Sequence, residues 1–540
     1  MRPLWYRNAV IYQIDPTLFR DNNGDGCGDL PGITERLDYI RGLGCTAIWL
    51  MPFYRSPFKD AGYDIADHLA VDPRFGDLTD MVALLEKAEE LGIHVIAELV
   101  VQHTSTEHPW FQEARRDRNS PYRDFYLWAD EPDDSIEPIF PTIEDSVWTW
   151  DDEAGQYYRH LFYHHEPDLN LENPRVIEHI ERIMAFWLRL GVSGFRIDAA
   201  SHLIEQAGGG DPEKGYWLLE HIRDFVTLRR PEAVVLGEID VEPEQYMDYF
   251  GEGDRVTLLL DFWINNYFFL ALARGQGEPL HKALLRQPEP PRRAQYAIWM
   301  RNHDELDLER LSDEEREEVM QTFAPDPDMR AYNRGIRRRL APMLDGDERR
   351  LAMAHAVFFS LPGTPILRYG EEIGMGDDLS REERLSVRTP MQWSNEPSAG
   401  FSCAPPERLV VPVIDTPPFD YPSVNVYAQT LRNDSLLAKT GNMVRTRIGL
   451  REIGEGRCCP VEVDQPAVFA VRHDADSTVL MLANLSDQDV RVAVRDDDLE
   501  DFVDLLADRD YEQPTGHPLR LHLGPYGYRW LRRKQQLFGG

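Results

Sequence analysis

The sequence has few cysteines, and they lack the spacing of a disulfide framework or a zinc site. Its 540 residues include five Cys, none of them in a Cys-x-x-Cys pair. An odd, scattered set of this kind favours a reducing compartment. The first residues, MRPLWYRNAVIYQ, lack the apolar stretch of a signal peptide, and no run reaches the roughly 20 apolar residues that cross a bilayer. We therefore expect a cytoplasmic protein without a membrane anchor.

Positive charge is also scarce, because 58 Lys and Arg stand against 94 Asp and Glu, a net charge of −36. A chain this acidic repels phosphate backbones and anionic lipids, so we expect no nucleic-acid partner and no membrane partner. The absence of a glycine period excludes a fibrous protein. The 42% of hydrophobic residues suffices for a large core and excludes a disordered chain. This balance fits a soluble protein whose substrate is neutral or cationic.

Short β-rich runs alternate with helical runs along most of the chain. Most of the β-rich runs are apolar at consecutive positions, as in parallel strands covered on both faces. Eight such units predict an α/β fold, a closed (β/α)8 TIM barrel. An open doubly wound sheet is the alternative, although no Gly-rich nucleotide loop follows the first run. The eight runs begin at Ala9, Thr46, His94, Gly194, Ala233, Val256, Tyr296 and Thr364.

Two connections are too long for simple loops. The first, after the third run, is rich in Trp, Tyr, His and Asp and predicts a small inserted domain at 104–171. The second, from about Glu305 to about Asp345, is strongly charged and predicted to be helical. Alternating apolar residues predict a C-terminal antiparallel β-sandwich domain at 451–540. The barrel would then comprise 1–103 and 172–450.

Charged residues recur at the ends of the predicted strands, on the rim where a barrel of this kind carries its functional groups. The fourth strand ends in Arg196 and Asp198, the fifth in Glu238, and the seventh in His303 and Asp304. Carboxylates held close together push their pKa values apart, so that one stays ionised while another keeps a proton. Cleavage of a glycosidic bond with retention uses such a pair, about 5–5.5 Å apart. The alternative is an ion-pair network of these acids with nearby arginines.

Seven segments occur in a familiar order, namely IYQIDPTLF, DNNGDGCGDLPGI, GYDIADH, EPDLN, GFRIDA, GEI and RNHDE. Through them the chain resembles the α-amylase family, glycoside hydrolase family thirteen, over essentially its whole length. The resemblance implies that Asp198 is the nucleophile that forms a β-glucosyl-enzyme and that Glu238 is the general acid and base. Asp304 would be the third carboxylate, which binds sugar hydroxyls. The implied substrate-binding residues are Tyr63, Asp64, His103, Arg196 and His303.

The segment from Asp21 to Asp29 alternates oxygen-bearing side chains with glycines. This pattern suits a structural calcium or magnesium loop, although Gly32 in place of a glutamate excludes an EF-hand. The alternative is an Asx-rich turn without metal. The ligands would be Asp21, Asn23, Asp25, Asp29 and the carbonyl of Cys27. Some members of the resembled family hold a second calcium, and the matching positions here are Gln102, Asp168, Glu205 and the carbonyls of His202 and Leu203.

One region resembles a particular group within the family. The segment from Ala324 to Ser402, with VRTPMQWSNEPSAGFS, is similar to trehalose synthases, which interconvert maltose and trehalose by intramolecular glucosyl transfer. That activity implies a closed pocket that retains the freed glucose and excludes water. Arg388 and the charged insert are candidate gate elements, with a surface ion pair as the alternative for Arg388.

Several residues depart from the pattern of that group. They are Glu98, Gln102, Asp240, Arg368 and Glu371, where Asp, Asn, Asn, Tyr and Asp are usual. These positions shape the acceptor side and leave room for a different short α-glucoside. An α-glucosidase that hydrolyses maltose is therefore the alternative enzyme, and a catalytically inactive binding subunit is a remote one. Whether the chain forms a homo-oligomer stays open.

Overall fold

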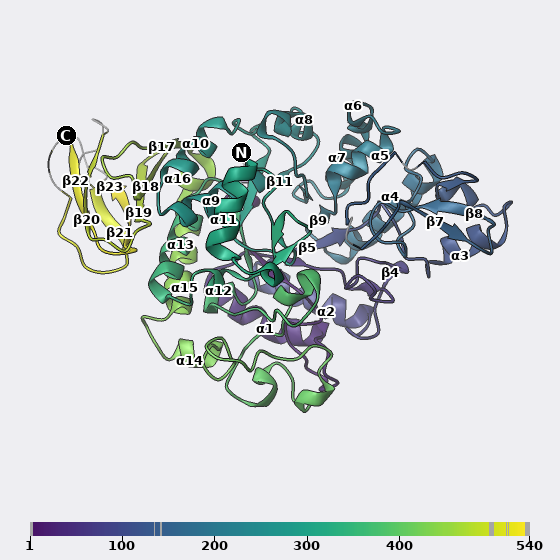
Figure 1. Ribbon diagram of the computed structural model, residues 1–540, viewed down its shortest axis with the longest axis horizontal. Coiled ribbons are helices and arrows are strands. Elements are labelled where there is room, and N and C mark those ends of the chain that lie inside the picture. The colour runs from purple at the N-terminus through teal and green to yellow at the C-terminus, as the bar shows by residue number, and fades with distance from the viewer. Residues whose placement is uncertain are drawn as a thin grey trace.

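The computed structural model describes residues 4–133, 135–140, 143–495, 502–514, 516 and 518–534. Within this part of the chain, eight parallel strands close into a barrel, with the last strand paired to the first (Figure 1). The predicted (β/α)8 fold is confirmed. The strands are β1 (Ile11–Ile14), β2 (Ala47–Leu50), β5 (His94–Leu99), β9 (Gly194–Ile197), β10 (Val234–Gly237), β11 (Leu258–Leu260), β12 (Gln295–Trp299) and β16 (Thr364–Arg368).

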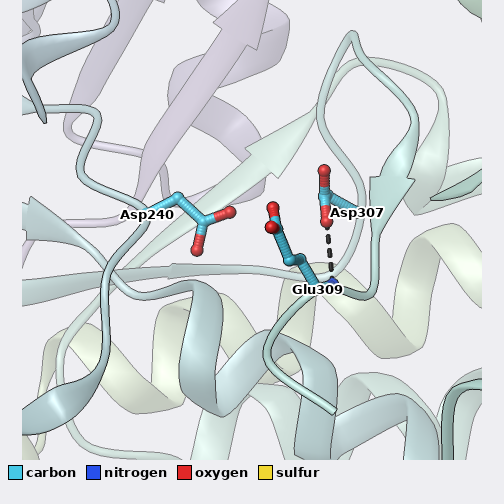
Figure 2. A group of neighbouring side chains, drawn as sticks. All are labelled: Asp240, Asp307 and Glu309. Atoms are coloured by element: carbon cyan, nitrogen blue, oxygen red, sulfur yellow. Dashed lines mark hydrogen bonds between the residues drawn. The ribbon is translucent and has the colours of Figure 1, made fainter. Parts of the chain in front are cut away.

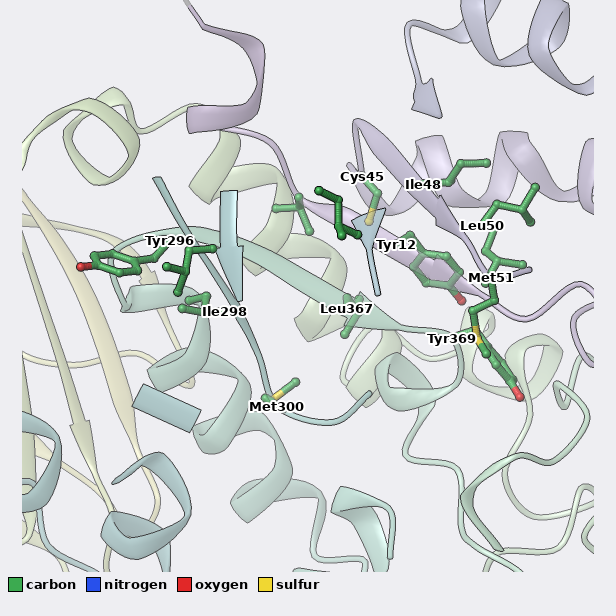
Figure 3. Close-up of a cluster of buried hydrophobic side chains, with 14 of the residues drawn as sticks. Tyr12, Cys45, Ile48, Leu50, Met51, Tyr296, Ile298, Met300, Leu367 and Tyr369 are labelled. Atoms are coloured by element: carbon green, nitrogen blue, oxygen red, sulfur yellow. The ribbon is translucent and has the colours of Figure 1, made fainter. Parts of the chain in front are cut away.

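The strands are apolar at consecutive positions because both faces of the sheet are covered. In β1, Ile11 belongs to the cluster that fills the barrel interior, and its neighbour Tyr12 packs outward against the helices. The same alternation places Trp49 of β2 inside and Ile48 outside. Figure 3 shows part of the outer layer, which includes Tyr12, Ile48 and Leu367. The strand period of two thus divides each apolar run between two cores.

Helices cover the outside of the barrel (Figure 1). Glycines in the left-handed conformation terminate two of them, Gly44 after α1 and Gly92 after α2. The helices that follow successive strands are α1 (Leu30–Leu43), α2 (Leu78–Leu91), α4 (Pro174–Leu190), α5 (Ala200–Ala207), α6 (Pro212–Gly215), α7 (Trp217–Arg229), α8 (Tyr246–Phe250), α9 (Phe262–Arg274), α10 (Glu278–Arg286), α12 (Leu340–Met343), α13 (Glu348–Ser360), α14 (Val426–Thr430), α15 (Leu436–Ile448) and α16 (Arg451–Glu455).

Two segments interrupt the regular alternation. Between β5 and α4 lie α3 (Pro109–Arg116) and a sheet of β6 (Trp128–Ala129), β8 (Gln156–Arg159) and β7 (Trp148–Asp151). The boundaries predicted for this inserted unit, 104 and 171, stay a prediction. The charged segment after β12 is less helical than predicted, because α11 (Asp313–Phe323) is accompanied by three two-residue strands. These are β13 (Leu306–Asp307), β14 (Arg330–Ala331) and β15 (Gly335–Ile336). A further short pair, β3 (Tyr54–Arg55) and β4 (Asp67–Val71), follows β2.

The C-terminal part folds into antiparallel sheets, as predicted. Two sheets enclose a separate apolar cluster to which Leu480 and Leu521 contribute. The larger contains β17 (Arg457–Pro460), β18 (Val468–Asp474), β19 (Thr478–Asn484), β23 (Tyr528–Arg533) and β21 (Phe502–Ala507), and the smaller β20 (Val490–Val494) and β22 (Leu519–Leu523). Figure 1 shows these sheets, in yellow, and the inserted segment, in blue, on opposite sides of the barrel. None of the described helices combines the length and apolar character needed to span a membrane.

Candidate active site

At the carboxyl end of the strands, polar side chains replace the apolar filling of the barrel. Gln13, Glu98 and Arg196 each lie two residues beyond a position on the inner face of their strand, and all three are buried. Glu98 and Arg196 occupy paired positions on neighbouring strands, and their side chains form an ion pair of 3.1 Å. The interior therefore changes from apolar to charged directly beneath the functional rim.

Arg196 joins the two predicted catalytic carboxylates. Its guanidinium contacts Asp198 through Nη1, and its Nη2 lies 2.7 Å from Oε2 of Glu238. The backbone N–H of Ala199 donates to the same oxygen at 2.9 Å. Because one guanidinium group contacts both acids, they lie close together, as retaining glycoside cleavage requires. Both carboxylates line a cavity at this rim, and Asp304 lines it as well.

The surroundings of Glu238 and Asp304 shift the pKa values of these two acids in opposite directions. Burial raises the pKa of Glu238, and the charge of Asp198 raises it further against the opposing effect of Arg196. Burial alone would raise the pKa of Asp304 as well, but His303, Arg384 and Arg388 outweigh it and lower that pKa. One acid is thus favoured to keep a proton while the other stays ionised.

Two arginines hold the ionised Asp304. Arg384 Nη1 and Arg388 Nη2 lie 2.8 and 2.9 Å from Oδ1 of Asp304. Arg388 is buried, donates its Nε–H to the carbonyl of His303 at 2.9 Å and does not line the cavity. Arg388 therefore contacts Asp304 from outside the cavity lining, whereas Arg384 is part of the cavity wall.

Tyr63, His103 and His303 line the cavity together, and their predicted role in binding the sugar stays a prediction. The rings of Tyr63 and His303 are stacked at 5.5 Å, and their Oη and Nε2 atoms are 2.7 Å apart. The hydroxyl of Tyr63 donates to Glu98 at 2.9 Å, so it accepts from His303. Gln13 donates its amide to Nδ1 of that histidine at 2.9 Å. Burial lowers the pKa of His303, which fits a neutral ring with its proton on Nε2.

Asp64 does not reach the cavity. Its carboxylate accepts from Ser56 Oγ and from the backbone N–H groups of Lys59 and Asp60, at 2.9–3.1 Å. Asp60 lines the cavity instead and lies 3.5 Å from Arg384. The sequence reasoning missed Asp60 and Arg384. The signal for Asp60 was its position three residues before Tyr63, whereas nothing in the sequence placed Arg384 beside Asp304.

The oxygen-rich loop from Asp21 to Asp29 has the donor types that calcium prefers, and Asp21 and Asp29 are buried. Its side-chain oxygens accept from the backbone of the loop itself, with Asp21 bound to Gly24 and Gly26 and Asp25 to Cys27. The donor set thus fits calcium, and the same contacts fit an Asx-rich turn.

At the second predicted metal site, Gln102 and Asp168 are buried. Among the residues that the structure describes, neither the amide of Gln102 nor Oδ2 of Asp168 has a hydrogen-bond partner. Nε of Arg159 lies 3.5 Å from that carboxylate oxygen. Glu205 pairs with His202 at 3.8 Å. The guanidinium of Arg159 therefore already faces Asp168, and a second calcium would have to share the Asp168 carboxylate with this cation.

Among the described residues, one set of three acidic, histidine or cysteine side chains offers ligand atoms within 4.8 Å of one another, namely Asp240, Asp307 and Glu309 (Figure 2). Asp240 and Asp307 line the cavity beyond Glu238. Arg310 Nε lies 3.0 Å from Asp240, and Arg334 Nε lies 2.7 Å from Asp307. These two arginines offset part of the negative charge of the three carboxylates, and we interpret the cluster as part of the cavity wall.

Comparison with known proteins adds two family matches. The family described as "Alpha amylase, catalytic domain" matches residues 13–453, which include every barrel strand from Gln13 of β1 onward. The family described as "Sucrose hydrolase-like, C-terminal domain" matches residues 477–532.

Individual proteins match over nearly the whole chain. A trehalose synthase of Pimelobacter is 39% identical over 98% of this chain and 96% of its own length. A trehalose synthase/amylase of Mycolicibacterium smegmatis is 44% identical over 82% of this chain and 76% of its own length. Among solved structures, an α-amylase from H. orenii is 27% identical with a TM-score of 0.79, covering 97% of this chain and 99% of its own.

Proposed function

Because the chain belongs to the α-amylase family of glycoside hydrolases, we propose that it is a retaining transglycosidase that interconverts maltose and trehalose. The observation that carries the proposal is the meeting of Asp198, Glu238 and Asp304 at one cavity, in a chain that is similar to trehalose synthases over almost its full length. The active-site geometry supports the chemistry, and the similarity supports the choice of substrate.

In the first step, the carboxylate of Asp198 attacks the anomeric carbon of the non-reducing glucose, and Glu238 gives its proton to the glycosidic oxygen. The bond between that carbon and the oxygen breaks, which leaves a β-glucosyl ester and a free glucose. In the second step, Glu238 takes a proton from the anomeric hydroxyl of the retained glucose as that oxygen attacks the ester. Asp198 leaves as a carboxylate, and an α,α-linked disaccharide forms.

The surrounding residues support these steps. The ionised Asp304 and the carboxylate of Asp198 face positive charge that develops on the sugar ring. The guanidinium of Arg196 contacts the carboxylate of Asp198 and orients it for attack. The paired rings of Tyr63 and His303 provide a rigid wall for the sugar.

Incubation with maltose tests the proposal. Trehalose as the main product, without incorporation of labelled glucose from the medium, is the expected result of intramolecular transfer. Glucose alone would identify the α-glucosidase instead. Asp198→Ala and Glu238→Gln should each remove nearly all turnover, whereas Asp476→Ala, at an exposed position between β18 and β19 of the C-terminal sheets, should leave turnover intact. Full activity of either catalytic variant toward every α-glucoside would contradict the assigned roles.

We further propose that the Asp21–Asp29 loop holds a structural calcium ion. Asp21, Asn23, Asp25, Asp29 and the carbonyl of Cys27 would bind it, and bound metal stabilises the folded state by mass action. Excess chelator should lower the melting temperature, and added calcium should restore it. The metal content separates one site from two, because the cation beside Asp168 disfavours a second ion. An unchanged melting temperature with metal confirmed absent would contradict the site.

We also propose that the protein binds a small neutral α-glucoside, has no nucleic-acid or membrane partner and is located in the cytoplasm. The net charge of −36 supports the exclusion of nucleic acids and anionic membranes as partners. Fractionation of cells and measurement of mass in solution test the location and the oligomeric state.

A further inference from the structure

Three separate segments meet above the catalytic cavity. Phe140 comes from the inserted segment after β5, Tyr332 from the charged insert after β12, and Glu383 from the loop after β16. The ring of Phe140 lies 4.8 Å from that of Tyr163 and 5.1 Å from that of Tyr332. Phe140, Ala331 and Tyr332 form a buried cluster separate from the cores of the barrel. We call this contact between the segments the junction.

Glu383 is the polar link of the junction. Its Oε2 accepts a hydrogen bond from the hydroxyl of Tyr163 at 3.2 Å and another from the hydroxyl of Tyr332. One carboxylate oxygen therefore ties the inserted segment to the charged insert. An ionised carboxylate is suited to this because it only accepts, and hydrogen bonds to a charged group are stronger than neutral ones.

The backbone at Glu383 is also unusual. Its φ of +44° lies in the left-handed region, which costs free energy for a residue other than glycine. Tyr332 has a φ of +54°. Strained positions of this kind persist only where their surroundings hold them, and here the two residues hold one another through the hydrogen bond between their side chains.

The residue after Glu383 reaches into the cavity. Arg384 contacts Asp304 at 2.8 Å and Asp60 at 3.5 Å, and its guanidinium lies 5.2 Å from the centre of the Phe140 ring. Phe140, Asp60, Asp304 and Arg384 all line the cavity. Glu383 thus directly precedes a cavity-lining cation, and its partner Tyr332 packs against the cavity-lining ring of Phe140.

We propose that Glu383 is a positioning residue that holds the three segments together over the freed glucose and thereby sets the ratio of transfer to hydrolysis. This inference rests on the proposed function. When the junction is closed, the glucose is retained and water is excluded from the β-glucosyl ester. When it opens, glucose escapes and water takes the place of the acceptor.

Four variants test this role. Glu383→Ala removes both hydrogen bonds, whereas Tyr163→Phe and Tyr332→Phe each remove one. Glu383→Gln is the conservative control, because its amide oxygen still accepts. With maltose as substrate, the ratio of glucose to trehalose should rise about tenfold in Glu383→Ala, as loss of hydrogen bonds to a charged group predicts. The two tyrosine variants should give smaller increases. Glu383→Gln should also give a smaller increase than Glu383→Ala, because its amide oxygen still accepts both hydrogen bonds but carries no charge.

Hydrogen–deuterium exchange supplies a second readout. Peptides that contain Phe140, Tyr163 and Tyr332 should exchange faster in Glu383→Ala than in the wild type, with the barrel strands unchanged. Faster exchange with an unchanged product ratio would overturn the proposed role, and so would an unchanged exchange rate. A wild type that makes only glucose overturns the proposed function and this inference with it. A wild type that makes trehalose, with the same ratio in Glu383→Ala, overturns the inference alone.

Discussion

Replacement of Arg388 by methionine tests how much the buried support of Asp304 contributes. The Arg388→Met variant lacks two hydrogen bonds of the wild type, a charge-assisted one to Asp304 and one to the carbonyl of His303, both of 2.9 Å. Removal of one partner from a buried ion pair costs about 3–5 kcal/mol. Asp304 keeps Arg384 at 2.8 Å and His303 at 3.0 Å, so we expect the lower end of that range, about 3 kcal/mol.

The pH dependence of this loss follows from the lowered pKa of Asp304. A carboxyl whose folded-state pKa is depressed contributes stability above its unfolded pKa of about 3.9, and this contribution is lost as the pH falls through the folded pKa. Arg388→Met raises the folded pKa toward the unfolded value. The difference in the free energy of unfolding between wild type and variant should therefore be constant from pH 6 to 8 and should become smaller below about pH 4.

Urea unfolding at several pH values measures the free energies, and the kinetics with maltose report on the site. We expect kcat/KM to fall together with stability, because Asp304 loses one of the two arginines that orient it. Arg451→Met is the matched control, since its ion pair with Glu455 lies on the surface and should contribute far less to stability. Equal losses in the two variants would refute the reasoning that burial makes the Arg388 pair important.

Three further predictions concern proton binding and packing. The apparent pKa of the alkaline limb of the kcat/KM profile should lie above the ordinary glutamate pKa of about 4.3, because Glu238 must be protonated for bond cleavage and its pKa is raised. An apparent pKa at the ordinary value would contradict this prediction. The stability of Asp240→Asn relative to wild type should increase as the pH rises. Burial and the charges of Asp307 and Glu309 outweigh Arg310 and raise the pKa of Asp240, and the stability that a carboxyl with a raised pKa contributes is lost with rising pH. Melting curves at pH 5 and 9 measure the difference in stability, and the same difference at both pH values would contradict the prediction. Gly215→Ala should lower the free energy of unfolding in urea by about 2–3 kcal/mol, because its Cβ would lie 1.7 Å from the carbonyl oxygen of Ile204. The control Gly42→Ala in α1, with open space around its Cβ, should be neutral or stabilising. A similar effect of both substitutions would contradict the predicted steric clash.

Much of the fold could be predicted from local patterns. The runs of consecutive apolar residues that alternate with helical runs are properties of short segments, so the barrel strands were found near their true positions. The small strands of the charged insert, β13, β14 and β15, were missed because each has two residues and no period of its own. They form only where the segment folds back on itself.

The chain order of motifs by itself determined the chemistry: Asp198, Glu238 and Asp304 follow three different strands, and parallel strands of a barrel deliver their carboxyl ends to one rim. Only the tertiary structure decided which neighbours those acids meet. Asp60 and not Asp64 lines the cavity, and Arg384 reaches Asp304 across 80 residues of sequence. Such contacts depend on the packing of distant loops, and neither composition nor spacing along the chain encodes the direction in which a loop side chain points.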